Sequence, residues 1–150
     1  MKRILQFALL AVVVASIIWL LVPRRDAGES TATVAAAPAE YVAYYFHRTA
    51  RCVTCLKIEQ SAHDAIFANF GPALRAGKLL FLPTNVEAAG NEHFIKDYEL
   101  VSQALVLVQY QDGKPMRSRN LDKIWDVIGD SAQFADYVTG EVAAFMGITP

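Results

Sequence analysis

Cysteine and histidine are scarce in this chain, and neither sign of charge is in excess. The 150 residues include two cysteines and three histidines, and 14 basic side chains are matched by 15 acidic ones. A structural zinc site needs four ligands, usually from two Cys or His pairs at similar spacing. His47, His63 and His93 show no such spacing, so the sequence indicates no zinc site of that kind. The balanced charge, without a basic run, indicates no nucleic-acid partner.

The two cysteines, Cys52 and Cys55, stand where a predicted strand passes into a predicted helix. Residues 41–47 are a dense run of aromatic and β-branched side chains, which indicates a buried strand. Residues 53–69 place apolar side chains near helical spacing, which predicts an amphipathic helix. Free N–H groups and the helix dipole favour an anion such as a thiolate at a helix N-terminus. A Cys-x-x-Cys motif in that position is typical of a redox pair.

In the redox interpretation, Cys52 is the exposed attacking thiolate, and Cys55 faces the core and resolves the mixed disulfide. Arg48 and Arg51 flank Cys52, where their charges would stabilise its thiolate. His47 ends the strand and is a possible proton carrier. We therefore predict catalytic roles for the two cysteines and supporting roles for the other three residues. The plainer alternatives are solvated arginines and a hydrogen-bonded histidine at a strand end.

Two other interpretations of the cysteine pair stay open. Cysteine is among the most buried residue types, so the pair can simply fill part of a core. Alternatively, Cys52, Cys55 and His47 could hold a thiophilic metal ion such as copper(I). In the redox interpretation no cofactor is expected.

A long apolar run precedes the motif. Residues 4–22 are apolar except for Gln6 and Ser16, and as a helix they would span about 28 Å, close to the hydrocarbon core of a bilayer. The run is longer than the apolar region of a cleaved signal peptide, which is the alternative, and Pro23-Arg24-Arg25 is a poor cleavage site. We predict a retained membrane anchor over residues 1–25.

The same features predict where the rest of the chain lies. A short N-terminal tail before the anchor favours a C-terminal domain on the extracytoplasmic side of the inner membrane, in the periplasm. An oxidising compartment also suits a disulfide-capable pair. Residues 26–40 lack aromatic side chains and predict a flexible linker. Residues 41–150 follow as one domain, long enough to bury its own core.

Strand and helix patterns alternate through this domain. Pro83 places the second predicted strand at a sheet edge or a bulge. The apolar run of the third strand predicts a central position, and the polar fourth strand predicts an edge. The order of elements gives an α/β sandwich with a mixed sheet. The predicted strands are at about 41–47, 78–86, 104–108 and 116–119, and the predicted helices are at about 53–69, at about 89–98 and in the last third of the chain.

Local signals mark where these elements begin and end. Gly71-Pro72 predicts the end of the first helix, and Asp112-Gly113 predicts a hairpin turn. Gly129 separates two helical pieces, and Asp130 with Gln133 predicts a capping box for the last one. The inward face of that helix is predicted to consist of Phe134, Val138, Glu141, Val142 and Phe145.

This order, with Cys-x-x-Cys opening the first helix, resembles the thioredoxin superfamily over residues 40–147. Three segments carry the resemblance: 44–46 before the motif, 81–86 as a strand, and 107–114 as a strand and hairpin. Within the superfamily, residues 51–59 are most similar to small bacterial proteins named as nitrophenyl-compound nitroreductase subunits. The resemblance implies a thioredoxin-like sandwich, here preceded by one transmembrane helix.

The resemblance also implies a function. The expected activity is thiol–disulfide exchange with protein thiols or disulfides, or with a membrane redox partner. A redox-inert subunit of a membrane or reductase complex is the remaining alternative.

The sequence departs from the family pattern at the motif and around it. Arg51 replaces the Trp before the first cysteine, and Val53-Thr54 replaces the Gly-Pro between the cysteines. Ala104 stands where the family's cis-proline is expected. The family's buried acid beneath the second cysteine is also missing, and aromatic residues 44–46 fill that region. These departures make general reductase activity of the thioredoxin type less expected.

Overall fold

A computed structural model describes residues 39–148 of the protein. The predicted anchor (residues 1–25) and the predicted linker up to residue 38 lie outside the described residues. Within residues 39–148, no helix combines the length and the apolar character needed to cross a bilayer. The fold begins slightly before the predicted domain boundary. Ala39 is buried, and the carbonyl of Glu40 accepts a hydrogen bond from the N–H of Tyr110 (2.8 Å).

The first strand, β1 (Tyr41–His47), is covered on both faces, which explains why its apolar residues alternate so poorly. Successive side chains of a strand point to opposite faces of the sheet. Accordingly, Ala43 and Tyr45 belong to one hydrophobic cluster and Phe46 to another, against which Tyr44 packs. The strand that leads to the cysteine pair therefore lies inside the fold.

The strands form a mixed sheet in the order β2-β1-β3-β4. β2 (Leu79–Asn85) runs parallel to β1, whereas β3 (Ala104–Gln111) runs antiparallel to it and pairs with β4 (Lys114–Asn120). The edge position predicted from Pro83 is confirmed, because β2 is an outer strand. The predicted central position of the third strand and edge position of the fourth are confirmed as well.

The hairpin between β3 and β4 is longer than the sequence predicted. Pairing continues up to Gln111 and Lys114, so that only Asp112 and Gly113 remain in the turn. Both turn residues have positive φ values, 51° and 74°. That combination is typical of a type I′ turn, whose twist matches the twist of the paired strands. The turn signal was therefore correct, and its effect on strand length was underestimated.

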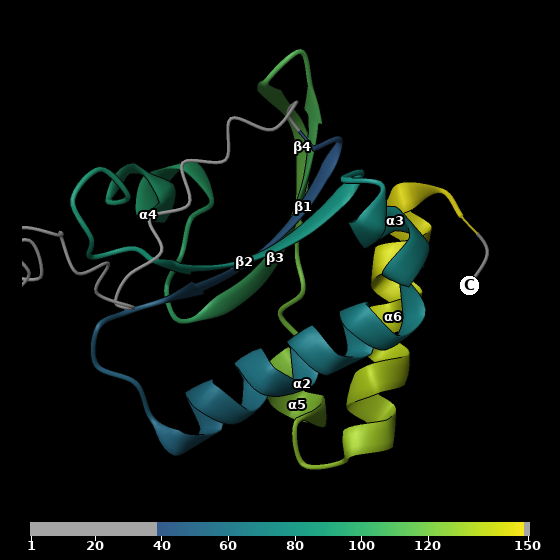
Figure 1. Ribbon diagram of the computed structural model, residues 1–150. Helices are drawn as coiled ribbons and strands as arrows, with labels where there is room; N and C mark the ends of the chain where they lie inside the picture. The colour runs from purple at the N-terminus through teal and green to yellow at the C-terminus, as the bar shows by residue number, and fades with distance from the viewer. Residues whose placement is uncertain (1–38, 149–150) are drawn as a thin grey trace, which may run out of the picture. The chain divides into compact units, whose positions relative to one another are not determined.

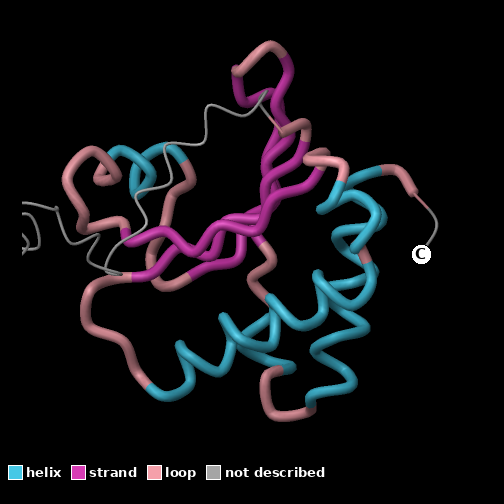
Figure 2. The backbone as a smooth tube through the Cα atoms, viewed as in Figure 1, coloured by secondary structure: helices cyan, strands magenta, loops and turns pink. Residues whose placement is uncertain are grey.

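Helices cover both faces of the sheet, as the α/β class requires (Figure 1). α2 (Val53–Asn69), α5 (Ile124–Val127) and α6 (Ser131–Met146) lie together on one side, and α4 (His93–Asp97) lies on the other (Figure 2). The larger core joins α2 and α6 to the sheet, and the smaller core lies on the α4 side. The coarse prediction of an α/β fold with a mixed sheet and flanking helices is confirmed.

Helix boundaries follow local chemistry closely. α2 begins and ends at the predicted residues. The Gly71-Pro72 pair ends it as predicted, but a further short helix, α3 (Gly71–Arg75), begins there with Pro72 in its first turn. α4 covers only 93–97 of the predicted 89–98.

The last helix, α6, is capped by Asp130. The Oδ1 atom of Asp130 accepts hydrogen bonds from the N–H groups of Ala132 (2.9 Å) and Gln133 (3.0 Å). The capping box is half formed, because the N–H of Asp130 donates to the carbonyl of Val127 instead of to the side chain of Gln133. The prediction that Glu141 faces inward was wrong: the residue is half-exposed, and its carboxylate binds a guanidinium on β4. The apolar members of the predicted face, Phe134, Val138, Val142 and Phe145, are buried.

Candidate active site at the start of α2

A disulfide joins Cys52 and Cys55 at the beginning of α2. Cys52 is the N-cap residue: its backbone is extended, and its Sγ atom accepts a hydrogen bond from the N–H of Cys55 (3.1 Å). Cys52 is exposed, whereas only 3% of Cys55 is exposed. The exposure predicted for each cysteine is confirmed, and their catalytic roles stay a prediction.

Tyr45 lies beneath the pair and connects it to β1. The side chain is fully buried, and its hydroxyl donates a hydrogen bond to the carbonyl of Cys55 (2.7 Å). Burial raises the pKa of Tyr45 to about 12, although Arg51 acts in the opposite direction. The hydroxyl is therefore neutral at physiological pH and remains a donor. Sequence reasoning placed Tyr45 in this region but missed the bond, whose only signal was that a buried hydroxyl needs a partner.

The sequence predicted that the charge of Arg51 would stabilise the Cys52 thiolate. In the structure this charge is paired with a carboxylate. The Arg51 guanidinium forms an ion pair with the carboxylate of Glu59, and both side chains are largely buried, with 22% and 23% exposed. The guanidinium carbon also lies 5.9 Å from the centre of the Tyr45 ring. Sequence reasoning did not single out Glu59. The available signal was its position one helical turn after Cys55, on the same face of α2.

His47 and Arg48 lie at the end of β1, and neither makes a polar contact with the cysteines within the described residues. The Nδ1 atom of His47 is hydrogen-bonded to the carbonyl of Arg48 (3.0 Å). Within residues 39–148, no hydrogen bond or ion pair joins either residue to Cys52 or Cys55. The two residues instead line a small pocket.

The loop between β1 and α2 is held by polar contacts with residues at the end of β2 and just after it. The N–H of Thr49 donates to Oε2 of Glu87 (3.0 Å), and the side chain of Asn85 donates to the hydroxyl of Thr49 (3.1 Å). The bond from Thr49, with a smaller contribution from the charge of Arg48, lowers the pKa of the Glu87 carboxyl. These contacts position the segment that leads into the disulfide.

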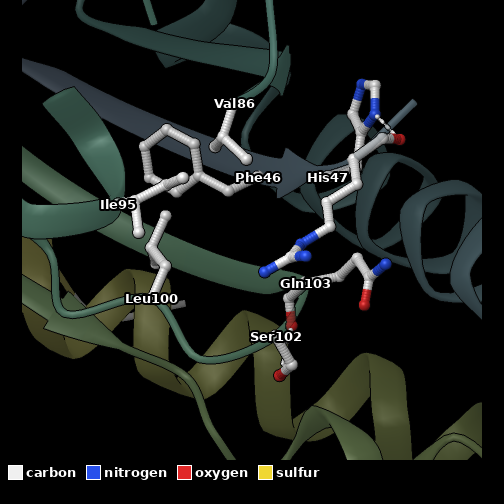
Figure 3. Close-up of a pocket in the computed structure, with 8 residues that line it drawn as sticks. Phe46, His47, Val86, Ile95, Leu100, Ser102 and Gln103 are labelled. Atoms are coloured by element: carbon white, nitrogen blue, oxygen red, sulfur yellow. Dashed lines mark hydrogen bonds between the residues drawn. The ribbon is translucent and has the colours of Figure 1, made fainter. Parts of the chain in front are cut away.

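The pocket opens where β1 ends (Figure 3). It holds about 230 Å³ of space, part of which is open solvent. Figure 3 shows apolar side chains gathered at one end and Ser102 and Gln103 at the other. Besides these two and the pair His47 and Arg48, its lining consists of Phe46, Val86, Ile95 and Leu100.

The segment before β3 lies beside this pocket and is tied to α5. Ala104 pairs with Phe46 at the end of β1, and the carbonyl of Gln103 accepts a hydrogen bond from the indole Nε1–H of Trp125 (3.1 Å). All peptide bonds within residues 39–148 are trans. Ala104 therefore follows a trans peptide bond at the position where the family pattern has a cis-proline.

The geometry gives no support to the metal interpretation. Within the described part of the chain, no three His, Cys, Asp or Glu side chains lie close enough together to hold a metal ion. The set of Cys52, Cys55 and His47 is thus not assembled, and the two thiols are joined in a disulfide.

Comparison with known proteins adds no family to this description. No protein-family model matches the chain, and no match is found among curated proteins.

Proposed function

We propose that this protein is a membrane-tethered thiol–disulfide oxidoreductase of thioredoxin-like fold, with Cys52 and Cys55 as its redox pair. The observation that carries the proposal is the disulfide at the N-terminus of α2, with one exposed and one buried cysteine. An exposed sulfur at a helix N-terminus can be attacked and can leave as a stabilised thiolate. A buried partner three residues on is placed to complete the exchange.

The chemistry needs only the two cysteines and a partner dithiol or disulfide. In the oxidising direction, a partner thiolate attacks Cys52 Sγ, forms a mixed disulfide and releases Cys55 as a thiolate, which takes up a proton. The partner's second thiolate then attacks the partner sulfur that is bonded to Cys52. This step forms the partner's disulfide and releases Cys52 as a thiolate. The partner is oxidised by two electrons, and the protein pair is reduced by two. The reducing direction is the reverse sequence.

The arrangement of elements supports the thioredoxin-like part of the proposal. A parallel β1-α2-β2 unit is followed by the antiparallel hairpin β3-β4 and a long final helix, α6. The Cys-x-x-Cys motif opens the first helix of this order, as the sequence resemblance expects. The partner is proposed to be a protein thiol or disulfide, or a membrane redox protein.

Membrane attachment rests on the apolar run at residues 4–22. A disulfide in the redox pair favours an oxidising compartment, which supports placing the domain on the extracytoplasmic side of the inner membrane. Carbonate extraction of membranes from cells expressing the full-length protein tests the attachment. The protein should remain in the pellet, and release into the supernatant would contradict a retained anchor.

Thiol exchange by the full-length protein in detergent solution is the direct test of activity. The reduced protein is mixed with oxidised glutathione or oxidised dithiothreitol, and the oxidised protein is mixed with the reduced form of either reagent. Free thiols are then trapped, and the Cys52–Cys55 disulfide is followed by mass. We expect exchange in both directions, with Cys52→Ser inactive. If the protein exchanges with none of these reagents, the proposal is contradicted and a redox-inert subunit remains as the alternative.

A further inference from the structure

The ion pair between Arg51 and Glu59 joins the residue before the redox pair to the residue one helical turn after it. Arg51 precedes Cys52 directly, and Glu59 follows Cys55 by one helical turn. The Arg51 guanidinium lies near the face of Tyr45, whose hydroxyl binds the Cys55 carbonyl. Because helical side chains tilt toward the N-terminus, the carboxylate of Glu59 leans back toward Cys55.

From this arrangement we infer that Glu59 is a positioning residue that restrains the reactivity of Cys52 by neutralising Arg51. The inference rests on the proposed exchange function, for which it names a controlling residue. A free guanidinium next to Cys52 would stabilise the Cys52 thiolate. The Glu59 carboxylate cancels that charge at short range, so the pair as a whole contributes little. Both side chains are less than one-quarter exposed, which limits screening by salt.

Neighbouring ionisable groups do not replace Arg51 in this role. The Lys57 ammonium donates a hydrogen bond to the carbonyl of Ile128 (2.8 Å), at the end of α5. The His47 ring is bonded to the Arg48 carbonyl, and Arg48 lines the pocket at the end of β1. Within the Arg51 side chain, the Nε atom is buried and has no hydrogen-bond partner in residues 39–148. Within the described residues, Glu59 is the one carboxylate that pairs with this guanidinium, which also lies over the Tyr45 ring.

The test compares Glu59→Gln, Arg51→Gln and the double variant by the rate of iodoacetamide labelling at Cys52 across pH. Glu59→Gln leaves the arginine uncompensated, so the labelling midpoint should fall, by about one pH unit in order of magnitude. A more acidic thiol is also a weaker nucleophile, with a Brønsted slope of about 0.4–0.5. Labelling of this variant should thus be about threefold faster than wild type at low pH and about threefold slower at the high-pH plateau.

The labelling curves of wild type and Glu59→Gln should therefore cross as pH rises. This crossing distinguishes control by charge from a variant in which the structure around Cys52 is merely loosened. A variant that only exposed Cys52 would be labelled faster at every pH. Arg51→Gln should shift the midpoint upward, because the carboxylate is then uncompensated, and the double variant should return close to wild type. Asp64→Asn is the matched control, since it removes the same charge from an exposed position on α2. It should leave the curve almost unchanged.

The equilibrium with glutathione provides a second readout. In this reaction the Cys52–Cys55 disulfide and two glutathione thiols give the reduced pair, as one thiolate and one thiol, together with glutathione disulfide and one proton. Above the labelling midpoint, Glu59→Gln should shift the equilibrium toward the reduced pair by up to about tenfold.

The inference is overturned if Glu59→Gln leaves the midpoint unchanged or raises it, or if Asp64→Asn acts as strongly. If Glu59→Gln folds poorly, the labelling midpoints of Arg51→Gln and the double variant still test the inference. Equal midpoints in these two variants would overturn it. Labelling with iodoacetamide needs no redox partner, so it is independent of the proposed exchange activity. If the variants show the expected shifts of the labelling midpoint but the protein does not exchange with glutathione, charge control is supported and the proposed function is contradicted. If the protein exchanges with glutathione but the variants do not shift the labelling midpoint as expected, only charge control is contradicted.

Discussion

Exposure and charge divide the two cysteines at the level of single residues. Cys52 is exposed at the helix N-terminus, whereas Cys55 is buried against the sheet. Unpaired N–H groups and the helix dipole stabilise a thiolate at the first position, and desolvation disfavours one at the second. The two environments therefore oppose each other within a single helical turn.

We predict that Cys52 is alkylated before Cys55 in the reduced protein, with a midpoint below the unperturbed value of about 8.5. Iodoacetamide labelling located by peptide mapping checks this order. Cys55→Ser should trap a mixed disulfide with the natural partner, and Cys52→Ser should trap none. Faster labelling of Cys55 would reverse the assignment, and equally slow labelling of both would favour a structural pair.

Tyr45→Phe removes the hydroxyl that binds the Cys55 carbonyl and nothing else. We expect the free energy of unfolding to fall by about 1 kcal/mol, the typical net contribution of such a bond. Urea unfolding of the oxidised protein measures the change. Tyr41→Phe is the matched control, because that hydroxyl accepts a longer, partly exposed bond from Gln109 (3.2 Å), and its loss should have a smaller effect. Equal losses would contradict a special role for Tyr45.

The same tyrosine predicts how stability changes in alkali. Its pKa is about 12 in the folded protein, mainly because of burial, and near 10 in the unfolded chain. Between these values the unfolded chain loses a proton that the folded protein keeps. The contribution of Tyr45 is therefore fully present below pH 10 and is lost as pH rises toward 12, by about 2 to 3 kcal/mol.

Burial also raises the pKa of Tyr44 and of Tyr98, so these residues act in the same direction. Unfolding free energies measured between pH 9 and 12 should decline more steeply for the wild type than for Tyr45→Phe. Identical slopes would show that Tyr45 does not titrate as described.

At the level of elements, helix ends carry measurable stability. Asp130 satisfies two N–H groups at the start of α6, which otherwise have no partner within the helix. The long helix in turn supplies much of the core that faces α2. A weak start to α6 would thus loosen the core that α6 shares with α2.

Asp130→Ala should lower the free energy of unfolding by about 1 kcal/mol, the usual effect of losing an N-cap side chain. Thermal or urea unfolding measures it. Asp136→Ala, at an exposed position within α6, removes the same charge without touching the cap and should change stability by less than about 0.5 kcal/mol. A loss as large in the control would mean that charge, not capping, is responsible.

For the molecule as a whole, the disulfide links redox state to stability. The bond closes a loop of only four residues, Cys52 to Cys55. Loop-closure entropy for so short a loop predicts that reduction lowers the free energy of unfolding by about 2 kcal/mol. Unfolding curves with and without dithiothreitol measure the difference. The double variant Cys52→Ser/Cys55→Ser should give superimposable curves, and a wild type insensitive to reductant would contradict the prediction.

Much of the secondary structure could be predicted because its signals are local. The bounds of α2, the two-residue turn at Asp112 and Gly113, and the N-cap at Asp130 depend on backbone and side-chain chemistry within a few residues. The strand positions in the sheet followed from Pro83 and from the continuous apolar run of β3. The burial of Cys55 followed from the helical period, and the exposure of Cys52 followed from the redox interpretation.

Contacts between distant segments were decided only by the tertiary structure. The bond from Tyr45 to Cys55 depends on how α2 lies across the sheet, and the pairing of Arg51 with Glu59 depends on how the loop enters the helix. The pocket that His47 and Arg48 line likewise depends on the position of the segment before β3. A side chain's sequence position restricts its reach, but packing of the surrounding elements chooses its partner, and this choice changed the expected role of Arg51.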